Sequence, residues 1–229
     1  MQNFSFARAT ETEQSLRGII FTGGEGPNPE FLREIAHGAD ILAAADSGLA
    51  AAEEAGLKPD WIVGDMDSLD NPARLEKYDP QRVIRYPHDK DFSDTELALS
   101  LLREKGCDEI WLAGGGGGRV DHLFAIRSLF ERWFPPDRWF TGSEQIRCLK
   151  EGMVLGAALP PKSRVSVFPL GESPWQAESS GLKWPLKGLF WDKGSFGLSN
   201  VAEEGPFQII SVRGRFMVMW ADPCMPKIA

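Results

Sequence analysis

The sequence lacks the features of a secreted protein, of a membrane-spanning protein and of a protein stabilised by disulfides or zinc. Its 229 residues contain three cysteines with no CxxC spacing, which favours reduced thiols over disulfides or zinc ligands. No apolar run approaches the roughly 20 residues that a membrane helix needs. Residues 1–16 form a polar leader without a hydrophobic signal core, so we expect no export and a cytoplasmic location.

The sequence also lacks an excess of positive charge and the common nucleotide-binding fingerprints. The formal net charge is −8, which argues against a nucleic-acid or anionic-membrane partner but leaves room for a small local phosphate pocket. The apolar run 18–21 precedes a turn, Thr22-Gly23-Gly24, that matches neither GxGxxG nor the P-loop pattern. A nucleotide site in this chain therefore has to be built differently.

Alternating apolar runs and helical patterns fill the first part of the chain. Strands are expected at 18–21, 41–45, 61–63, 83–86 and 109–112, and helices at 31–36, 49–55, 72–78, 93–105 and 121–134. This order predicts an α/β fold: a Rossmann-like, mainly parallel sheet with helices on both faces. In such sheets, ligands bind beyond the carboxyl ends of the strands.

Helical pattern stops near Phe134-Pro135-Pro136, and short strands follow. They are expected at 138–141, 145–149, 153–159, 164–168, 207–212 and 215–220, with Gly and Pro between them. This spacing predicts a small all-β sandwich. We therefore expect an α/β nucleotide- and Mg-binding domain over 17–137 and a β-sandwich domain over 138–229.

The central motif is Gly64-Asp65-Met66-Asp67-Ser68, which directly follows the expected strand 61–63. In extended backbone, Asp65 and Asp67 point to the same side. Two carboxylates held close need a cation or a shared proton, and Mg²⁺ prefers oxygen ligands. A solvated acidic turn is an equally good interpretation of this pentapeptide alone.

A second acidic stretch, 89–94, precedes a helix. Ser93 and Glu96 form an S-x-x-E capping box, which puts Asp94 in the first helical turn. Asp94 there complements the helix dipole. Asp89, Asp91 and Lys90 make the stretch more highly charged than a cap requires.

Five consecutive glycines, 114–118, lie between a buried strand and the helix expected at 121–134. Glycines are entropically costly to order, so close approach of the backbone to a ligand is a better explanation than a linker. Backbone amides, the helix amino terminus and Arg119 would suit a phosphate. We expect the acidic residues that follow strands to lie along one edge of the sheet. They are Asp46, Asp65, Asp67, those of the stretch 89–94, and Asp121.

Together these stretches resemble the thiamine pyrophosphokinase family from about residue 18 to the end. Six motifs carry the resemblance in order: 45–48 (ADSG), 58–68 (KPDWIVGDMDS), 90–99 (KDFSDTELAL), 117–122 (GGRVDH), 181–186 (GLKWPL) and 197–200 (GLSN). The departures are Ser47 in place of Gly, Met66 in place of Phe, and Ser93 in place of Thr. None of them removes a carboxylate, and Ser47 bears on how closely the backbone approaches a nucleotide.

The resemblance implies an ATP:thiamine diphosphotransferase that makes thiamine diphosphate and AMP, with Mg²⁺ as cofactor and ATP as co-substrate. It implies a homodimer with the thiamine site at the subunit interface. Metal ligands would be Asp65, Asp67 and Asp94, with Asp121 close by. The nucleotide would contact Asp46, Ser47, Gly48, Gly117, Gly118 and Arg119. Lys90 and Asp91 would lie near the join of the two substrates, and Ser199 and Asn200 at the thiamine site.

Attack at the β-phosphorus needs charge neutralised more than covalent help, which Mg²⁺ and Arg119 can supply. Either Asp94 or Asp91 can take the proton of the thiamine hydroxyl, and Trp191 is a candidate aromatic partner for the thiazolium. Three alternatives stay open: a 6-hydroxymethylpterin pyrophosphokinase, an Mg-dependent phosphohydrolase, and a non-catalytic nucleotide-binding regulator.

Overall fold

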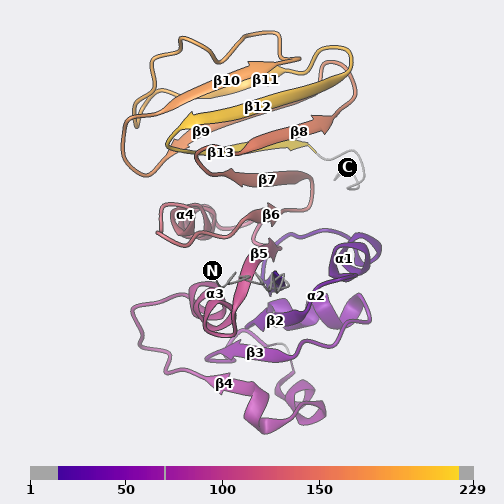
Figure 1. Ribbon diagram of the computed structural model, residues 1–229. Coiled ribbons are helices and arrows are strands. Elements are labelled where there is room, and N and C mark those ends of the chain that lie inside the picture. The colour runs from indigo at the N-terminus through magenta and orange to yellow at the C-terminus, as the bar shows by residue number, and fades with distance from the viewer. Residues whose placement is uncertain (1–14, 70, 222–229) are drawn as a thin grey trace, which may run out of the picture.

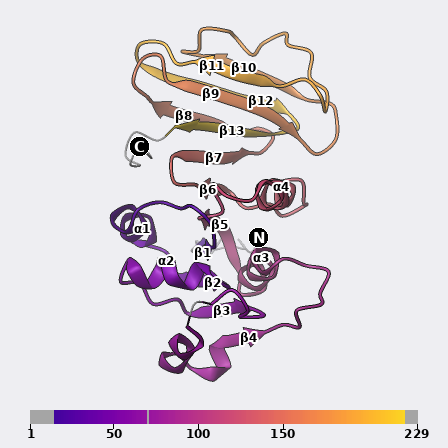
Figure 2. The same cartoon turned by 180° about the vertical axis from the view of Figure 1, so that it is seen from behind.

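The computed structural model describes residues 15–69 and 71–221. Its backbone is organised by a ten-stranded sheet in the order β11-β9-β13-β7-β6-β5-β1-β2-β3-β4, with a separate three-stranded sheet, β10-β12-β8. Figures 1 and 2 show the large sheet running through the whole molecule, with the small sheet against one end of it. The predicted leader lies almost entirely outside the described residues.

One half of the large sheet is parallel. Its strands are β1 (Leu16–Thr22), β2 (Ile41–Ala45), β3 (Trp61–Gly64), β4 (Val83–Arg85), β5 (Cys107–Ala113) and β6 (Arg138–Phe140). β1 pairs with β2 on one side and β5 on the other, so the strand order reverses between β1 and β5. Ligands bind at such a switch point, beyond the carboxyl ends of the strands.

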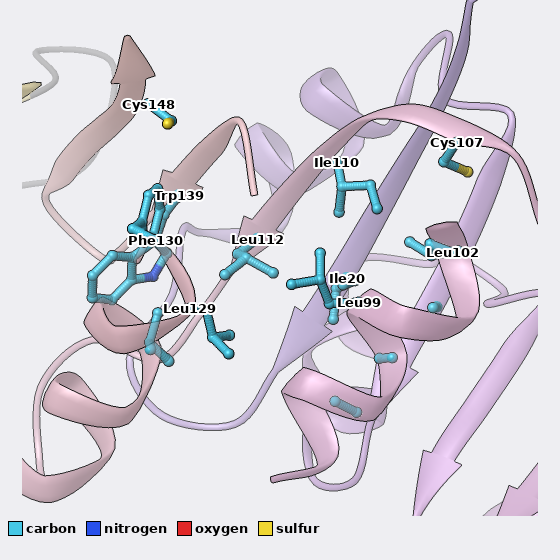
Figure 3. Close-up of a cluster of buried hydrophobic side chains, with 14 of the residues drawn as sticks. Ile20, Leu99, Leu102, Cys107, Ile110, Leu112, Leu129, Phe130, Trp139 and Cys148 are labelled. Carbon is cyan, nitrogen blue, oxygen red and sulfur yellow. The ribbon is translucent and has the colours of Figure 1, made fainter. Parts of the chain in front are cut away.

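Helices cover both faces of this parallel half (Figures 1 and 2). α1 (Pro29–Ala36) and α2 (Gly48–Glu54) pack on one face, against Ile19 and Phe21 of β1. α3 (Asp94–Glu104) and α4 (Val120–Leu129) pack on the other face, which carries Ile20. Figure 3 shows this second cluster, in which α3 and α4 bury apolar side chains against β1 and β5. Successive residues of β1 therefore point to opposite faces of the sheet and pack into two separate hydrophobic cores.

The other half of the sheet is antiparallel. It consists of β7 (Glu144–Leu149), β13 (Arg215–Ala221), β9 (Arg164–Leu170) and β11 (Gly197–Val201), and joins the parallel half where β6 meets β7. The small sheet contains β8 (Val154–Ala158), β10 (Gln176–Ser180) and β12 (Pro206–Arg213). A shared apolar core, including Val167, Phe207 and Phe216, lies between the sheets.

The predicted fold class is confirmed as a mixed α/β fold with a large, mostly parallel sheet and a separate antiparallel sheet. Two local features differ from the sequence predictions. No strand was predicted at 197–201, where β11 lies. The last helix ends at Leu129 rather than at 134, and Phe130 is its C-terminal cap.

Smaller features also differ from expectation. β10 was not predicted, because QAESS lacks the apolar alternation of a strand. The weak helix at 72–78 is a 3₁₀ turn, Pro72–Lys77, with a second one at Pro80–Arg82. Among the described helices, none is long and apolar enough to cross a membrane.

Candidate active site

Three carboxylates converge beyond the carboxyl ends of β2 and β3. Asp46 follows β2, Asp65 follows β3, and Asp94 is the first residue of α3. Each offers an oxygen within 4.8 Å of the others. The predicted gathering of acidic residues along one edge is therefore seen for these three.

Gly64 makes this convergence possible. A Cβ atom there would lie 3.2 Å from the Asp46 Cβ and 3.2 Å from the Asp94 Cγ, tighter than ordinary packing. Asp46 has a left-handed backbone (φ 46°) and is 8% exposed. Its Oδ1 is buried and has no hydrogen-bond partner in the described part of the chain. A buried acceptor without a donor is costly, and it marks a place for a cation or a ligand donor.

Lys90 provides the positive charge of the cluster. Its Nζ lies 2.8 Å from Asp65 Oδ2 and 3.2 Å from Asp94 Oδ1. The hydrogen bond from Lys90 lowers the pKa of Asp65 to about 2. Burial opposes the charged form of Lys90, but its bonds to Asp65 and Asp94 outweigh this and raise the Lys90 pKa.

Asp94 differs from Asp65 in its titration. Burial raises the pKa of Asp94, and the nearby charges of Asp65 and Asp46 add to this, although Lys90 opposes it. One ammonium against three carboxylates leaves an excess of negative charge. A hard divalent cation such as Mg²⁺ suits an all-carboxylate donor set and would neutralise the excess, so the residues present fit the implied metal.

Asp67 lies outside this cluster. It belongs to a second acidic group with Asp65 and His88, whose Nε2 is 3.1 Å from Asp67 Oδ2. Asp67 is exposed and also accepts a hydrogen bond from Ser68 at 3.0 Å. Met66 between the two carboxylates has φ 66° and is buried, so the backbone turns sharply there rather than staying extended. The geometry therefore joins Asp46, rather than Asp67, to Asp65 and Asp94.

The first three glycines of 114–118 serve packing. A Cβ on Gly114 would lie 2.1 Å from the Thr22 carbonyl oxygen, and one on Gly115 would lie 2.1 Å from Ile126. Gly116 forms a bridge with Glu25, which holds the turn after β5 against the turn after β1. Close approach of protein backbone therefore accounts for these glycines, whereas the sequence suggested a ligand.

Gly117 and Gly118 are exposed and have positive φ values of 61° and 59°. The neighbouring Arg119 is paired with Asp121, its Nη2 lying 2.5 Å from the Asp121 carboxylate. Both side chains are exposed. The bond to Asp121 raises the pKa of Arg119, and the same bond lowers the pKa of Asp121. These residues are therefore exposed and lie outside the three-carboxylate cluster.

Gly48 and Ser47 lie at the start of α2. A Cβ on Gly48 would lie 2.2 Å from the Phe21 carbonyl oxygen, so this glycine lets α2 pack against β1. Ser47 lies beside Gly23, where a Cβ would be 2.2 Å from the Ser47 Oγ. Ser47 therefore faces the turn that follows β1.

A cavity of about 330 Å³ opens at the switch point. Of the predicted site residues, it is lined by Asp46, Ser47, Lys90 and Asp94. Gly115 of the predicted glycine run lines it too. Sequence reasoning assigned no site role to the following lining residues: Thr22, Gly23, Gly24, Ala45, Ser68, His88, Phe92, Ser93, Thr95, His122, Ala125 and Ile126. The Gly-rich turn after the first strand was the available signal, because β1 borders the switch point. Thr22 and Thr95 share a 2.7 Å hydroxyl hydrogen bond, which ties β1 to α3.

The other predicted site residues lie elsewhere. Asp91 is exposed and is not among the cavity-lining residues. Asn200 is buried in β11, where its side chain bonds the backbone of Trp184 and Val201. Ser199 is exposed with φ 58°, and its backbone N–H donates to Ser166 Oγ. β11 and β4 form opposite edges of the large sheet, so Ser199 and Asn200 are far from the carboxylates of the same chain.

Comparisons with known proteins show which family this chain resembles. Residues 32–137 match the family model described as thiamin pyrophosphokinase, catalytic domain. A thiamine pyrophosphokinase from Bacillus subtilis (strain 168) is 28% identical over 155 residues, which cover 66% of this chain and 72% of the relative.

Solved structures share the fold. A thiamin pyrophosphokinase from Geobacillus thermodenitrificans superposes with a TM-score of 0.70 at 24% identity, covering 92% of this chain and 100% of its own. The Bacillus subtilis structure gives a TM-score of 0.71 at 23% identity, covering 90% and 99%. The yeast structure gives 0.63 at 17% identity, covering 92% and 87%. The family resemblance drawn from the six sequence motifs is thereby confirmed: this chain is similar to the thiamine pyrophosphokinases in sequence over the catalytic domain and in fold over nearly its whole length.

Proposed function

We propose that this chain is a thiamine pyrophosphokinase, which transfers a diphosphate from ATP to the hydroxyl of thiamine and releases AMP. The observation that carries the proposal is the convergence of Asp46, Asp65 and Asp94 around Lys90, at the switch point of a domain that matches the family model. The comparisons do not favour the pterin kinase, the phosphohydrolase or the regulator.

Several groups of the chain would bind different parts of the triphosphate. Mg²⁺, held by Asp65 and Asp94 with Asp46 or Asp67, would neutralise polyphosphate charge as the leaving AMP takes up electrons. Lys90 lies between two carboxylates and can donate to a phosphate oxygen as well. The turns after β1 and β5 line the same cavity with backbone groups, as a Rossmann-like nucleotide site would. Arg119 at the rim would reach the phosphates after releasing Asp121.

Asp94 is the better candidate for accepting the hydroxyl proton. It lines the cavity, and burial raises its pKa, whereas the hydrogen bond from Lys90 lowers the pKa of Asp65. Asp91 is exposed and does not line that cavity. Because the alcohol loses its proton late, the positioning of the acceptor contributes more than the strength of the base.

The thiamine side of the site requires a second copy of the chain. β11 and β3 are eight strand positions apart in the sheet, which corresponds to roughly 38 Å. Ser199 cannot contact a substrate at Asp65 of its own chain over that distance. A homodimer in which β11 of one protomer faces the cavity of the other would bring Ser199 to the substrate. We also propose domains at 17–137 and 138–229 and a cytoplasmic location.

The direct test incubates the purified protein with Mg-ATP and thiamine and follows the nucleotides and thiamine esters by chromatography. AMP and thiamine diphosphate should form in equal amounts, and EDTA should abolish both. Formation of ADP or free phosphate instead would overturn the proposal. Mixing an Asp65→Asn variant with a Ser199→Tyr variant tests the shared site, because only a heterodimer would retain one intact cavity.

A further inference from the structure

A row of arginines crosses the amino-terminal part of the sheet. Arg17 of β1 pairs in register with Glu109 of β5, and Arg138 of β6 pairs in register with Arg147 of β7. The face is that of α1, because Trp111 of β5 contacts both Arg17 and Arg138 and packs in the α1 core. Arg17 lies five residues, or roughly 16 Å, before the carboxyl end of β1. The row is therefore separate from the candidate active site.

Glu109 is the only carboxylate in the row and is fully engaged. It accepts hydrogen bonds from Arg17 Nε at 2.9 Å and from Trp111 Nε1 at 2.8 Å. Arg138 Nε lies 3.6 Å from Glu109, and this buried atom has no hydrogen-bond partner in the part of the chain that the structure describes. Arg147 makes no hydrogen bond or ion pair to any described residue. Three guanidinium groups thus share one carboxylate.

The pairing of Arg138 with Arg147 is unfavourable as it stands. Like charges directly opposite each other on neighbouring strands destabilise a sheet. Burial lowers the pKa of Arg138 to about 10, and it lowers the pKa of Arg147 as well. Glu109 and Asp137 attract both guanidinium groups, but Glu109 also pairs with Arg17, and Asp137 pairs with Arg103 and Lys150. An anion bound between Arg138 and Arg147 would therefore offset more of the cost of burying them. The overall charge of −8 makes this positive cluster unusual for the protein.

A cavity of about 260 Å³ opens beside Arg138. Gln145, two residues before Arg147 on the same strand face, lines it and offers an amide donor. Its other lining residues are Phe31, Glu34, Ile35, His37, Trp111 and Phe140. Glu34 on α1 adds one negative charge to the lining. The cavity is large enough for a small oxyanion and has an aromatic wall.

We propose that Arg138 and Gln145, which line this cavity, form a binding site for a phosphate group together with Arg147, which pairs with Arg138 on the neighbouring strand. The phosphate is either inorganic phosphate or a small phosphomonoester. Planar guanidinium forks bind phosphate oxygens in pairs, and two facing forks suit a doubly charged anion. A phosphomonoester would place its apolar body on the aromatic wall, whereas inorganic phosphate would fill only the charged end. Occupancy would remove the repulsion between β6 and β7, where the parallel and antiparallel halves of the sheet join.

The test measures the binding of inorganic phosphate by calorimetry and by thermal melting, in EDTA and at constant ionic strength. Without metal, the three carboxylates of the active site repel phosphate, which isolates the second site. Phosphate should raise the melting temperature of the wild type. Arg147→Gln should weaken phosphate binding on the order of ten- to a hundredfold, since it removes a charged hydrogen-bonding group. Arg147→Lys, which keeps the charge but loses the fork, should weaken it less.

The matched control is Arg213→Gln, because Arg213 is an exposed arginine on β12 outside the row. It should bind phosphate as the wild type does. Phenyl phosphate distinguishes the two sources: tighter binding than phosphate assigns the site to a phosphomonoester, and equal binding assigns it to inorganic phosphate. Equal phosphate affinity in the wild type and in Arg147→Gln would overturn the proposal, as would an equal melting shift with chloride.

Discussion

The two ends of the parallel sheet carry opposite and unbalanced charges. Beyond the carboxyl ends, Asp46, Asp65 and Asp94 share one ammonium, that of Lys90. Toward the amino ends, the arginine row of Arg17, Arg138 and Arg147 shares one carboxylate, that of Glu109. Each end therefore lacks counter-charge.

The imbalance shows why fold stability and ligand binding have to be considered together. Buried charges in excess cost folding energy, and a sequence optimised for stability alone would pair or remove them. At the acidic end, the proposed Mg²⁺ and the positively charged thiamine would supply the missing positive charge. At the basic end, the missing partner is an anion. Substitutions that remove one charge should consequently have opposite effects on stability and on function.

The largest expected effect is on turnover at the acidic end. Asp65→Asn and Asp94→Asn should each lower kcat by on the order of a hundred- to a thousandfold, because each removes a carboxylate that would hold Mg²⁺ against the reacting phosphates. The rate of AMP formation under saturating Mg-ATP and thiamine measures this, with circular dichroism to check the fold.

Asp121→Asn is the matched comparison, since Asp121 is exposed and paired with Arg119. We expect a loss of less than about tenfold there. Arg213→Gln should leave the rate unchanged. Wild-type activity in Asp65→Asn or Asp94→Asn would remove that residue from the reaction.

The next effect is on stability at the basic end. Glu109→Gln should lower the free energy of unfolding by about 1–3 kcal/mol, because it deprives the row of its only carboxylate and leaves partly buried guanidinium groups unpaired. Urea unfolding at neutral pH measures the change. Phosphate should restore part of the loss if it supplies negative charge to the same row. A stability equal to that of the wild type would show that the row needs no counter-charge.

Much of the acidic end was accessible from sequence, because strand ends, a capped helix and acidic residues are local signals. The capping hydrogen bond from Glu96 N–H to Ser93 Oγ is present at 3.3 Å, as predicted. Glu96 itself bonds Arg132 instead of returning to the cap. The predicted strands carrying Asp46 and Asp65 are also present, so the placement of these carboxylates followed from the element order.

What sequence could not supply was contact between distant turns. The sequence suggested that the glycine run binds phosphate. In the structure, a side chain at Gly114 would collide with Thr22, and one at Gly115 would collide with Ile126. These contacts exist only in the folded chain, so the sequence does not indicate them. The sequence predicted Asp67 beside Asp65 and Asp94, whereas the structure places Asp46 there. This difference depends on the left-handed turn at Met66, which no local sequence pattern indicates. The arginine row depends on strand order, since β1, β5, β6 and β7 become neighbours only through the crossover.

The third prediction concerns pH at the acidic end. Asp65 has a folded pKa of about 2 against an ordinary value of 3.8, chiefly because Lys90 bonds its carboxylate. A lowered carboxyl pKa stabilises the fold above the unfolded value, so this contribution should be lost as the pH falls from about 4 to about 2. Its size should be about 1–2 kcal/mol after allowance for solvent. Urea unfolding of the wild type and Asp65→Asn in EDTA, from pH 5 to 2, should show a steeper decline for the wild type. Parallel curves would assign acid sensitivity to other carboxyls.

The smallest effect should be a gain in stability without metal. Asp46→Asn removes one of three clustered negative charges, and asparagine tolerates the left-handed backbone at φ 46° as well as aspartate does. The amide also offers donors to the neighbouring carboxylates. In EDTA we therefore expect Asp46→Asn to unfold at an equal or higher urea concentration than the wild type, by up to about 1 kcal/mol. Addition of Mg²⁺ should reverse the order, because the wild type binds the cation more tightly and gains more stability from it. A loss of stability in EDTA would mean that Asp46 holds the fold through its charge, and the contrast with Glu109→Gln would then fail.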